Sequence, residues 1–335
     1  MRNIAIAVFV EMLAFLVSSN VAAADESKEK VQEEVFVDVD ADKATHEEIK
    51  PLKIKFKRLT SLRLSPDGNL LVCDGGKKLI RVVNPKGKKV NRFKLPFQPE
   101  AIDVAADGTI YCGGEGTLVK LDAQGKRLQK VEAPSDVPSE GLPDHGKYLR
   151  KIRVSGIAVT GDDVFVAFGS AWSRRSLSKI FRFDRDLQNP KLIAEGLRGC
   201  CQRCDIATDG RVLYVAENTR YRILKLDREG NELGSWGSRS RTGLEGFGAC
   251  CNPMNVCLGP EGAIYTAESG LGRIKRYTAG GKLLDLVGYV GVTRFTRAGH
   301  LAAACSNIAV DATPDGQRVF VMDYTNNLVR VLQKK

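Results

Sequence analysis

Short alternating runs of apolar and polar residues recur along most of the chain, and acidic turns separate them. Six such turns recur at intervals of roughly 40 to 55 residues. They are Asp67-Gly68, Asp107-Gly108, Asp162-Asp163, Asp209-Gly210, Glu261-Gly262 and Asp315-Gly316. An Asp-Gly pair between alternating runs favours a β-hairpin, because glycine tolerates a positive φ. The pattern therefore predicts six copies of one antiparallel unit.

Each copy also contains a third alternating run after its second strand. These predicted third strands are Leu79–Val83, Leu118–Leu121, Lys179–Phe183, Arg222–Leu226, Arg273–Tyr277 and Leu328–Leu332. Repeats of this length with several strands are typical of propeller blades. The sixth copy lacks a fourth strand, and we predict that Leu52–Phe56 supplies it, which closes the ring without open edges. The predicted fold is an all-β, six-bladed β-propeller whose N-terminal strand closes the last blade.

Two stretches resemble a known repeat. Residues Asn218–Asp227 and Trp236–Pro253 are similar to the NHL-repeat consensus, and the resemblance extends over roughly residues 55–335. The resemblance implies a propeller, with the lactonase and SMP-30-like superfamily as more distant relatives. NHL-like propellers include interaction platforms, lyases and relatives of lactonases, so the resemblance implies no single activity.

The N-terminus has the pattern of a secretory signal peptide over residues 1–24. Arg2 precedes an apolar stretch that Glu11 interrupts, and Ala22–Ala24 provide small residues for cleavage. An uncleaved anchor remains the alternative, although the apolar stretch is short for a membrane span. Residues 25–48 are rich in charge and predict a flexible leader, so the propeller is expected to occupy residues 49–335. The expected location is periplasmic or secreted, with no transmembrane span after cleavage.

The net charge of +11 favours anionic partners. Lys and Arg occur in every repeat, which suggests a soluble basic surface. Behind a signal peptide we expect a protein or an envelope polymer as partner, no nucleic acid, and a monomeric chain.

The innermost strand of each predicted blade has one apolar face and one small or polar face, with a period of two. The polar face should line the central channel. Its predicted polar members are Arg63, Asp103, Arg203, Asp205, Asn255 and Asn307. Carboxylate and amide oxygens suit calcium, which lactonase-type propellers hold in this place. The two arginines instead favour a polar channel in which the aspartates are neutralised.

Seven of the nine cysteines fall in or just before the inner strands of the last three repeats. They are Cys200, Cys201, Cys204, Cys250, Cys251, Cys257 and Cys305. We expect them to gather at one end of the channel, whereas Cys73 and Cys112 should pack in the core. Disulfides, a thiolate-bound metal or iron–sulfur cluster, and redox-active thiols all remain open. The odd total leaves at least one thiol unpaired.

Catalytic residues cannot be assigned from the sequence. The chain has only three histidines, His46, His145 and His300, and no nucleophile-elbow or P-loop motif. The extended loops Pro134–Tyr148 and Ser170–Ser178, the second with Trp172, are candidate recognition elements. The sequence therefore favours a non-catalytic binding or scaffold module of the cell envelope. The alternative is a metal- or iron–sulfur-binding redox protein or a lactonase-like hydrolase at the channel mouth.

Overall fold

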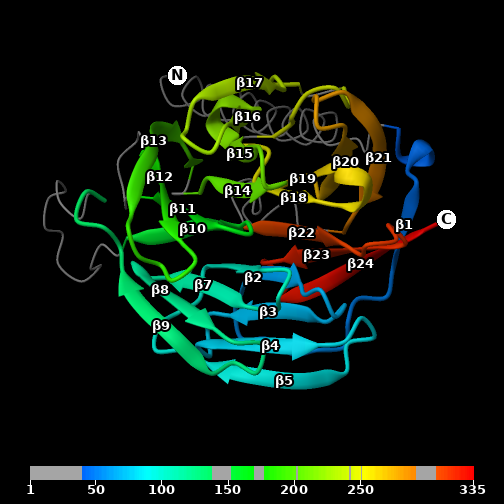
Figure 1. Ribbon diagram of the computed structural model, residues 1–335. Helices are drawn as coiled ribbons and strands as arrows, with labels where there is room; N and C mark the ends of the chain where they lie inside the picture. The colour runs from blue at the N-terminus through cyan, green and yellow to red at the C-terminus, as the bar shows by residue number, and fades with distance from the viewer. Residues whose placement is uncertain are drawn as a thin grey trace, which may run out of the picture. The chain divides into compact units, whose positions relative to one another are not determined.

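The computed structural model describes residues 40–137, 152–169, 177–200, 203–240, 243–249, 251–291 and 307–335. Within these ranges the chain forms six four-stranded antiparallel sheets around a common axis (Figure 1). Helical structure in the described part consists of short 3-10 turns, among them Ala41–Lys43, Asn218–Arg220 and Pro260–Gly262. The predicted all-β, six-bladed propeller is confirmed.

Each blade runs outward from the axis in chain order. Blade 1 contains β2 (Leu59–Leu64), β3 (Leu70–Asp74), β4 (Leu79–Val83) and β5 (Lys89–Lys94). Blade 2 contains β6 (Ala101–Val104), β7 (Ile110–Gly114), β8 (Thr117–Leu121) and β9 (Arg127–Glu132). Blade 3 contains β10 (Arg153–Val159), β11 (Asp163–Gly169), β12 (Leu177–Asp184) and β13 (Lys191–Arg198).

The remaining blades repeat this order. Blade 4 contains β14 (Asp205–Thr208), β15 (Leu213–Glu217), β16 (Arg222–Leu226) and β17 (Glu232–Trp236). Blade 5 contains β18 (Asn255–Leu258), β19 (Ile264–Glu268), β20 (Arg273–Tyr277) and β21 (Leu283–Tyr289). Blade 6 contains β22 (Ile308–Ala312), β23 (Arg318–Asp323) and β24 (Leu328–Lys334), and β1 (His46–Ile49) is its outermost strand.

The predicted hairpin turns have the expected backbone geometry. Gly68, Gly108 and Gly316 adopt φ values of 78°, 81° and 65°, a region that a side chain disfavours. Each follows an inner strand, so the acidic-Gly signal correctly marked the turn between the first and second strands of these blades.

The ring closes as predicted, but through an earlier segment. β1 pairs with β24 in antiparallel register, from His46 opposite Lys334 to Ile49 opposite Val331. The prediction that Leu52–Phe56 forms this strand is wrong, and β1 begins inside the predicted leader. Leu52–Phe56 forms no ladder; its apolar side chains instead pack against the core shared by blades 6 and 1. One-sided burial produces the same alternation as strand pairing, which explains the error.

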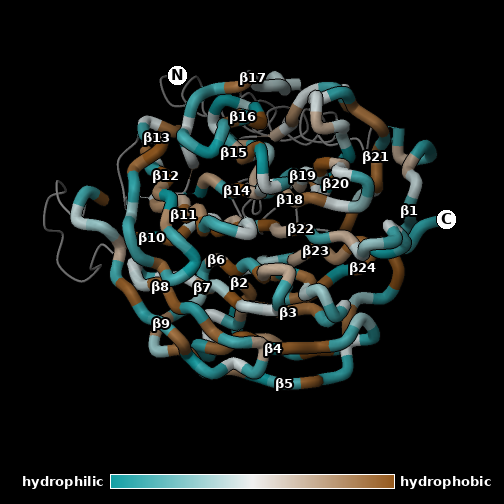
Figure 2. The backbone as a smooth tube through the Cα atoms, in the orientation of Figure 1, coloured by the Kyte–Doolittle hydropathy of each residue, from teal (hydrophilic) through white to brown (hydrophobic). Residues whose placement is uncertain are grey.

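The core is divided into clusters that lie mostly between neighbouring blades. One cluster joins blades 1 and 2, another joins blades 3 and 4, and a third joins blades 5 and 6. The second strands of the first five blades, β3, β7, β11, β15 and β19, are buried along their whole length. Figure 2 shows apolar residues recurring along the strands of the blades. No helix among the described residues is long and apolar enough to cross a membrane.

A buried acidic residue ends the second strand in four of the blades and pairs with an arginine of the third strand. The pairs are Asp74 with Arg81, Glu217 with Arg222, Glu268 with Arg273, and Asp323 with Arg330, at 2.7 to 3.0 Å. Three of these carboxylates also accept a backbone N–H group from the preceding part of the chain: Asp74 from Arg58, Glu217 from Arg198 at the end of β13, and Glu268 from Gly248. The carboxylates therefore fasten each connection to its blade.

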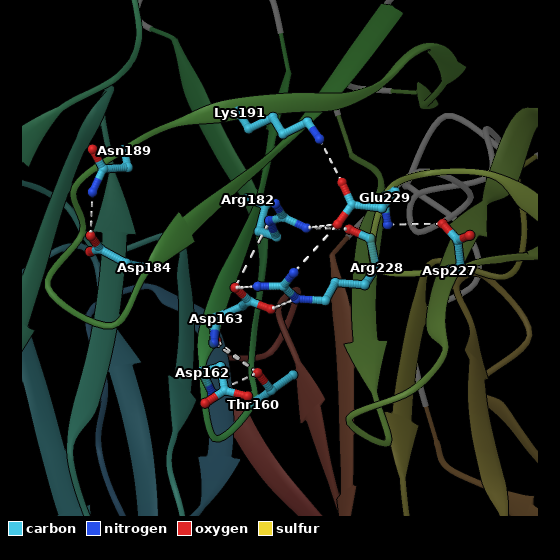
Figure 3. A network of polar contacts seen from close by, with 10 residues as sticks. All are labelled: Thr160, Asp162, Asp163, Arg182, Asp184, Asn189, Lys191, Asp227, Arg228 and Glu229. Atoms are coloured by element: carbon cyan, nitrogen blue, oxygen red, sulfur yellow. Dashed lines mark hydrogen bonds and ion pairs between the residues drawn. The ribbon is translucent and has the colours of Figure 1, made fainter.

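A separate polar network joins blades 3 and 4 (Figure 3). Arg228, in the turn after β16, donates from Nε and Nη2 to the two carboxylate oxygens of Asp163, at 2.5 and 2.8 Å. Its neighbour Glu229 pairs with Arg182 and, at 2.5 Å, with Lys191. Such a bidentate arginine–carboxylate pair is specific in geometry, and here it fixes one blade against the next.

Candidate functional site

The inner strands place two tiers of side chains toward the propeller axis. The strand registers align the first tier as Ser61, Ala101, Gly156, Asp205, Asn255 and Ala309. The same registers align the second tier as Arg63, Asp103, Ala158, Ala207, Cys257 and Asp311. The polar side chains therefore form two groups. A charged group on the second tier comes from blades 1, 2 and 6, and a polar pair on the first tier comes from blades 4 and 5.

The charged group of the second tier is centred on Arg63. Its Nε lies 3.0 Å from Oδ1 of Asp103, and its Nη1 lies 3.7 Å from Oδ2 of Asp311. The three side chains are only 15%, 16% and 7% exposed. Burial alone would lower the pKa of Arg63, but the carboxylates of Asp103 and Asp311 outweigh it and raise that pKa above its usual value. The guanidinium therefore stays charged and neutralises this tier.

Both carboxylates of this group also bind the backbone of the next blade. Oδ2 of Asp103 accepts the N–H of Val159 at 2.9 Å, and Oδ2 of Asp311 accepts the N–H of Leu64 at 2.8 Å. Burial raises the pKa of Asp103 and raises that of Asp311 to about 6, against the opposing effect of Arg63. Each aspartate is thus a bridge between neighbouring inner strands.

The first tier contains a second bridge of the same kind. Oδ2 of Asp205 accepts the N–H of Val256 at 3.0 Å and a hydrogen bond from the side-chain amide of Asn255. Oδ1 of Asn255 in turn accepts the N–H of Val310 at 2.8 Å. Blades 4, 5 and 6 are therefore linked in series through two axial side chains. Burial raises the pKa of Asp205 to about 7, although the Val256 N–H and Arg63 favour its charged form.

Four of the six predicted channel residues lie on these tiers: Arg63, Asp103, Asp205 and Asn255. Arg203 and Asn307 precede their strands, so both predictions fall beyond the two tiers. The side chain of Asn307 donates to the carbonyl of Thr60, and the carbonyl of Arg203 accepts from Asn218.

Asp311 was not among the channel residues predicted from the sequence. The period-two pattern correctly identified which face of β22 looks toward the axis, because residues 307, 309 and 311 share it. The polar position of this strand was predicted at Asn307, four residues before Asp311. A carboxylate at the same spacing before the turn as Asp103 was the available signal.

The described cysteines do not form one centre. Cys204 packs in the core between blades 3 and 4, whereas Cys257, on the second tier, adjoins the core between blades 5 and 6, and both are fully buried free thiols. Burial raises the pKa of both thiols, so neither is a ready metal ligand. Cys73 and Cys112 are buried together in the core of blades 1 and 2, as predicted. The expected cluster of seven therefore does not include Cys204 and Cys257.

The other cysteines lie before the inner strands or outside the described residues. Cys200 donates its N–H to Oδ1 of Asn218, and Cys251 is buried in the connection before β18. Cys201, Cys250 and Cys305 fall outside the described residues, as do His145, His300 and Trp172. His46 lies in β1, the outermost strand of blade 6, where its ring contacts the carbonyl of Gly316. It is therefore separated from the axis by the other three strands of the blade.

The axial residues do not fit a calcium site. Calcium requires six to eight oxygen ligands, and a cation beside Arg63 meets a fixed positive charge. One carboxylate oxygen of each of Asp103, Asp205 and Asp311 already accepts a backbone N–H group of the next blade. Within the described ranges, no three or more His, Cys, Asp and Glu side chains are grouped so that they could hold a metal ion.

Comparisons with known proteins agree on the fold. No protein family model matches the chain, and no curated protein matches it in sequence. Among solved structures, it is similar to a calcium-binding protein, regucalcin, from Agrobacterium tumefaciens, with a TM-score of 0.58 and 15% identity over 87% of this chain and 93% of that one. It is also similar to a gluconolactonase from Xanthomonas campestris, with a TM-score of 0.59 and 13% identity over 90% and 94%.

A third similar structure is a protein of unknown function from Bacteroides thetaiotaomicron, with a TM-score of 0.60 and 14% identity over 88% of this chain and 74% of that one. At these identities the likeness shows the propeller fold alone.

Proposed function

We propose that this chain is a non-catalytic binding propeller that is exported to the periplasm or secreted. In this proposal the side chains on its axis serve to hold neighbouring blades together. One observation carries the proposal: the buried aspartates on the axis bridge neighbouring blades. Asp103, Asp205 and Asp311 each accept a backbone N–H from the next inner strand. A side chain held in this way contributes to ring closure and is not available to turn toward a substrate.

The charge balance of the axis supports the same proposal. A general base or a metal ligand must present a lone pair to an incoming group. Here Arg63 lies between Asp103 and Asp311, and it is itself largely buried. The binding surfaces of the propeller are then its outer faces and loops, as in other propellers that serve as interaction platforms.

A lactonase-like hydrolase is the second candidate, because Asp205 and Asn255 place carboxylate and amide oxygens side by side in the first tier. The fold resembles that of a gluconolactonase and of a calcium-binding protein. This function requires that a divalent cation displace the hydrogen bond between these two side chains.

Calcium binding distinguishes the two candidates. We expect 1 mM calcium to leave the melting temperature of the purified chain unchanged, and we expect no hydrolysis of gluconolactone above the buffer rate. The variant Asp205→Asn is the matched comparison, since it removes the only carboxylate of the first tier. A calcium-dependent rise in melting temperature that Asp205→Asn abolishes, together with lactone hydrolysis, would replace the proposal with the lactonase-like function.

A further inference from the structure

The basic charge of the chain is concentrated in one blade. Residues 50–94 contain fourteen Lys and Arg residues and two Asp residues, a net charge of +12, whereas the whole chain carries +11. Lys and Arg occur in every repeat, as expected, but outside residues 50–94 a similar number of acidic residues balances them. Residues 59–94 form blade 1, and residues 50–58 form the segment that enters it. The attraction of the molecule for anions is centred there.

The entering segment presents a row of lysines. Its apolar side chains at positions 52, 54 and 56 turn inward, against the core of blades 6 and 1. Lys53, Lys55 and Lys57 alternate with them and are exposed. We call these three lysines the first row. One-sided packing of an extended chain thus fixes three positive charges on the same side.

The first row runs along the length of blade 1. Gly87, in the turn after β4, lies against Leu52, and Gly76, in the turn before β4, lies against Lys57. Between them the ring of Phe56 lies under the guanidinium of Arg81, at 5.2 Å. The segment therefore crosses the face of β4 from one end of the strand to the other.

A second row lies on the outermost strand, β5. The register places Lys89 opposite Val83, Arg92 opposite Arg81 and Lys94 opposite Leu79. Residues directly opposite one another in an antiparallel pair project from the same face. The second row, Lys89, Arg92 and Lys94, is therefore on the face of blade 1 that carries Phe56 and the first row, and all three side chains are exposed.

The two rows run in the same direction with similar spacing. Both begin at the turn after β4 and end at the turn before it. Neighbouring charges within a row are two residues, or two register positions, apart, which corresponds to roughly 6 to 7 Å. None of the six side chains forms an ion pair with a described residue, and the buried carboxylate of Asp74 is held by Arg81. The rows are thus an uncompensated, regularly spaced array.

We propose that these two rows bind a linear polyanion with phosphodiester-like spacing, laid along the edge of blade 1. Five of the six cations are lysines, which act as point charges and demand no bidentate geometry. The aromatic side chains among the described residues are buried or half-buried, and Arg81 covers the ring of Phe56 between the rows, so bases would find no free platform for stacking. An anionic polymer without bases therefore fits better than a nucleic acid. The proposal supplies a partner class for the binding role above.

The probe for this proposal is an abasic deoxyribose-phosphate oligomer of about 20 units, titrated against the full-length chain between 50 and 200 mM salt. Six phosphate contacts give a slope of about −4 in log K against log salt, so the affinity falls about 300-fold over this range. We expect Lys89→Glu, Arg92→Glu and Lys94→Glu together to reduce the slope to about −2. Lys53→Glu, Lys55→Glu and Lys57→Glu together should do the same.

A matched control changes the same charge on the next blade. Lys126, Arg127 and Lys130 are exposed at or beside β9, the outer strand of blade 2. Their replacement by Glu alters the net charge equally, and we expect the slope to stay at about −4. If the slope falls equally in this control, net charge alone explains the effect of the substitutions, and the proposal is overturned. Melting temperatures of all three variants, expected to be unchanged, exclude unfolding as the cause.

Two further outcomes would contradict the polymer as partner. Binding of single-stranded DNA more than about threefold tighter than the abasic oligomer of equal length would show that bases contribute. Binding to phosphatidylglycerol vesicles without binding to the oligomer would point to a lipid surface. Neither result bears on the axis, so this proposal and the non-catalytic function can fail separately.

Discussion

Arg63 on β2 and Asp103 on β6 form an ion pair, with Nε and Oδ1 3.0 Å apart, that joins the inner strands of blades 1 and 2. Asp103 continues the link by accepting the N–H of Val159 in blade 3. A guanidinium from one blade and a carboxylate from the next thus connect three blades at the axis. Ion pairs in a buried setting stabilise weakly as a pair, but removal of one partner leaves an uncompensated charge.

This arrangement predicts the effect of removing the guanidinium. Arg63→Met should lower the free energy of unfolding by about 3 kcal/mol, because Asp103 and Asp311 would remain buried without a cation. Arg63→Lys keeps the charge and should lose less. Urea unfolding at pH 7 measures both variants. Equal stability of Arg63→Met and the unmodified chain would show that the carboxylates are solvated or protonated without the arginine.

The pH dependence of stability should reveal Asp205. Its folded pKa of about 7 lies above the usual 3.8, so the folded state binds its proton more tightly than the unfolded state does. The stabilisation is therefore complete below about pH 4 and is lost as the pH rises through 7. Asp311, with a pKa of about 6, acts in the same direction. His46, whose pKa burial lowers, acts in the opposite direction.

A comparison with Asp205→Asn isolates this group, since the amide oxygen can still accept from Val256. Between pH 5 and pH 8 the unmodified chain should lose about 2 kcal/mol of stability relative to the variant. Chemical denaturation at several pH values gives both curves. Parallel curves would mean that Asp205 is ionised throughout this range, and that the Val256 N–H and Arg63 outweigh its burial.

The buried thiols lead to a prediction that separates packing from chemistry. Cys204 and Cys257 are fully buried in two different interblade cores. Neither should react with a water-soluble thiol reagent in the folded chain, and both should react after denaturation. Cys204→Ala should cost about 1 kcal/mol through lost packing, with or without a chelator. Rapid labelling of Cys204 or Cys257 in the native chain, detected by peptide mapping, would contradict the packing role.

The repeat and its turns could be read from the sequence because both depend on local chemistry. Gly68 and Gly108 were identifiable as turn residues from their acidic neighbours, and Leu79–Val83 from its composition. Asp311 precedes its acidic turn by four residues, as Asp103 does, so its axial position was also readable, whereas its contact with Arg63 depends on closure of the ring between blades 6 and 1. The period of two places Cys204 and Cys257 on opposite faces of their inner strands, but the interblade cores that they enter depend on how neighbouring blades pack.

Closure of the ring by β1 gives the last prediction, and it can be tested by truncation. A chain that begins at residue 40 retains β1 and its register with β24, whereas one that begins at residue 50 lacks it. The shorter chain exposes the edge of β24 and loses the contact between the ring of His46 and the carbonyl of Gly316. It also loses the ion pair between Glu48 and Arg330, at 2.7 Å.

We expect the shorter chain to melt at a clearly lower temperature and to aggregate, because an unpaired strand edge invites intermolecular pairing. Residues 50–58 are kept in both chains, so the comparison separates the strand from the segment that packs beside it. If the two chains have the same melting temperature and stay monomeric in light scattering, β1 does not contribute to the stability of the ring, and the axial bridges alone hold it closed.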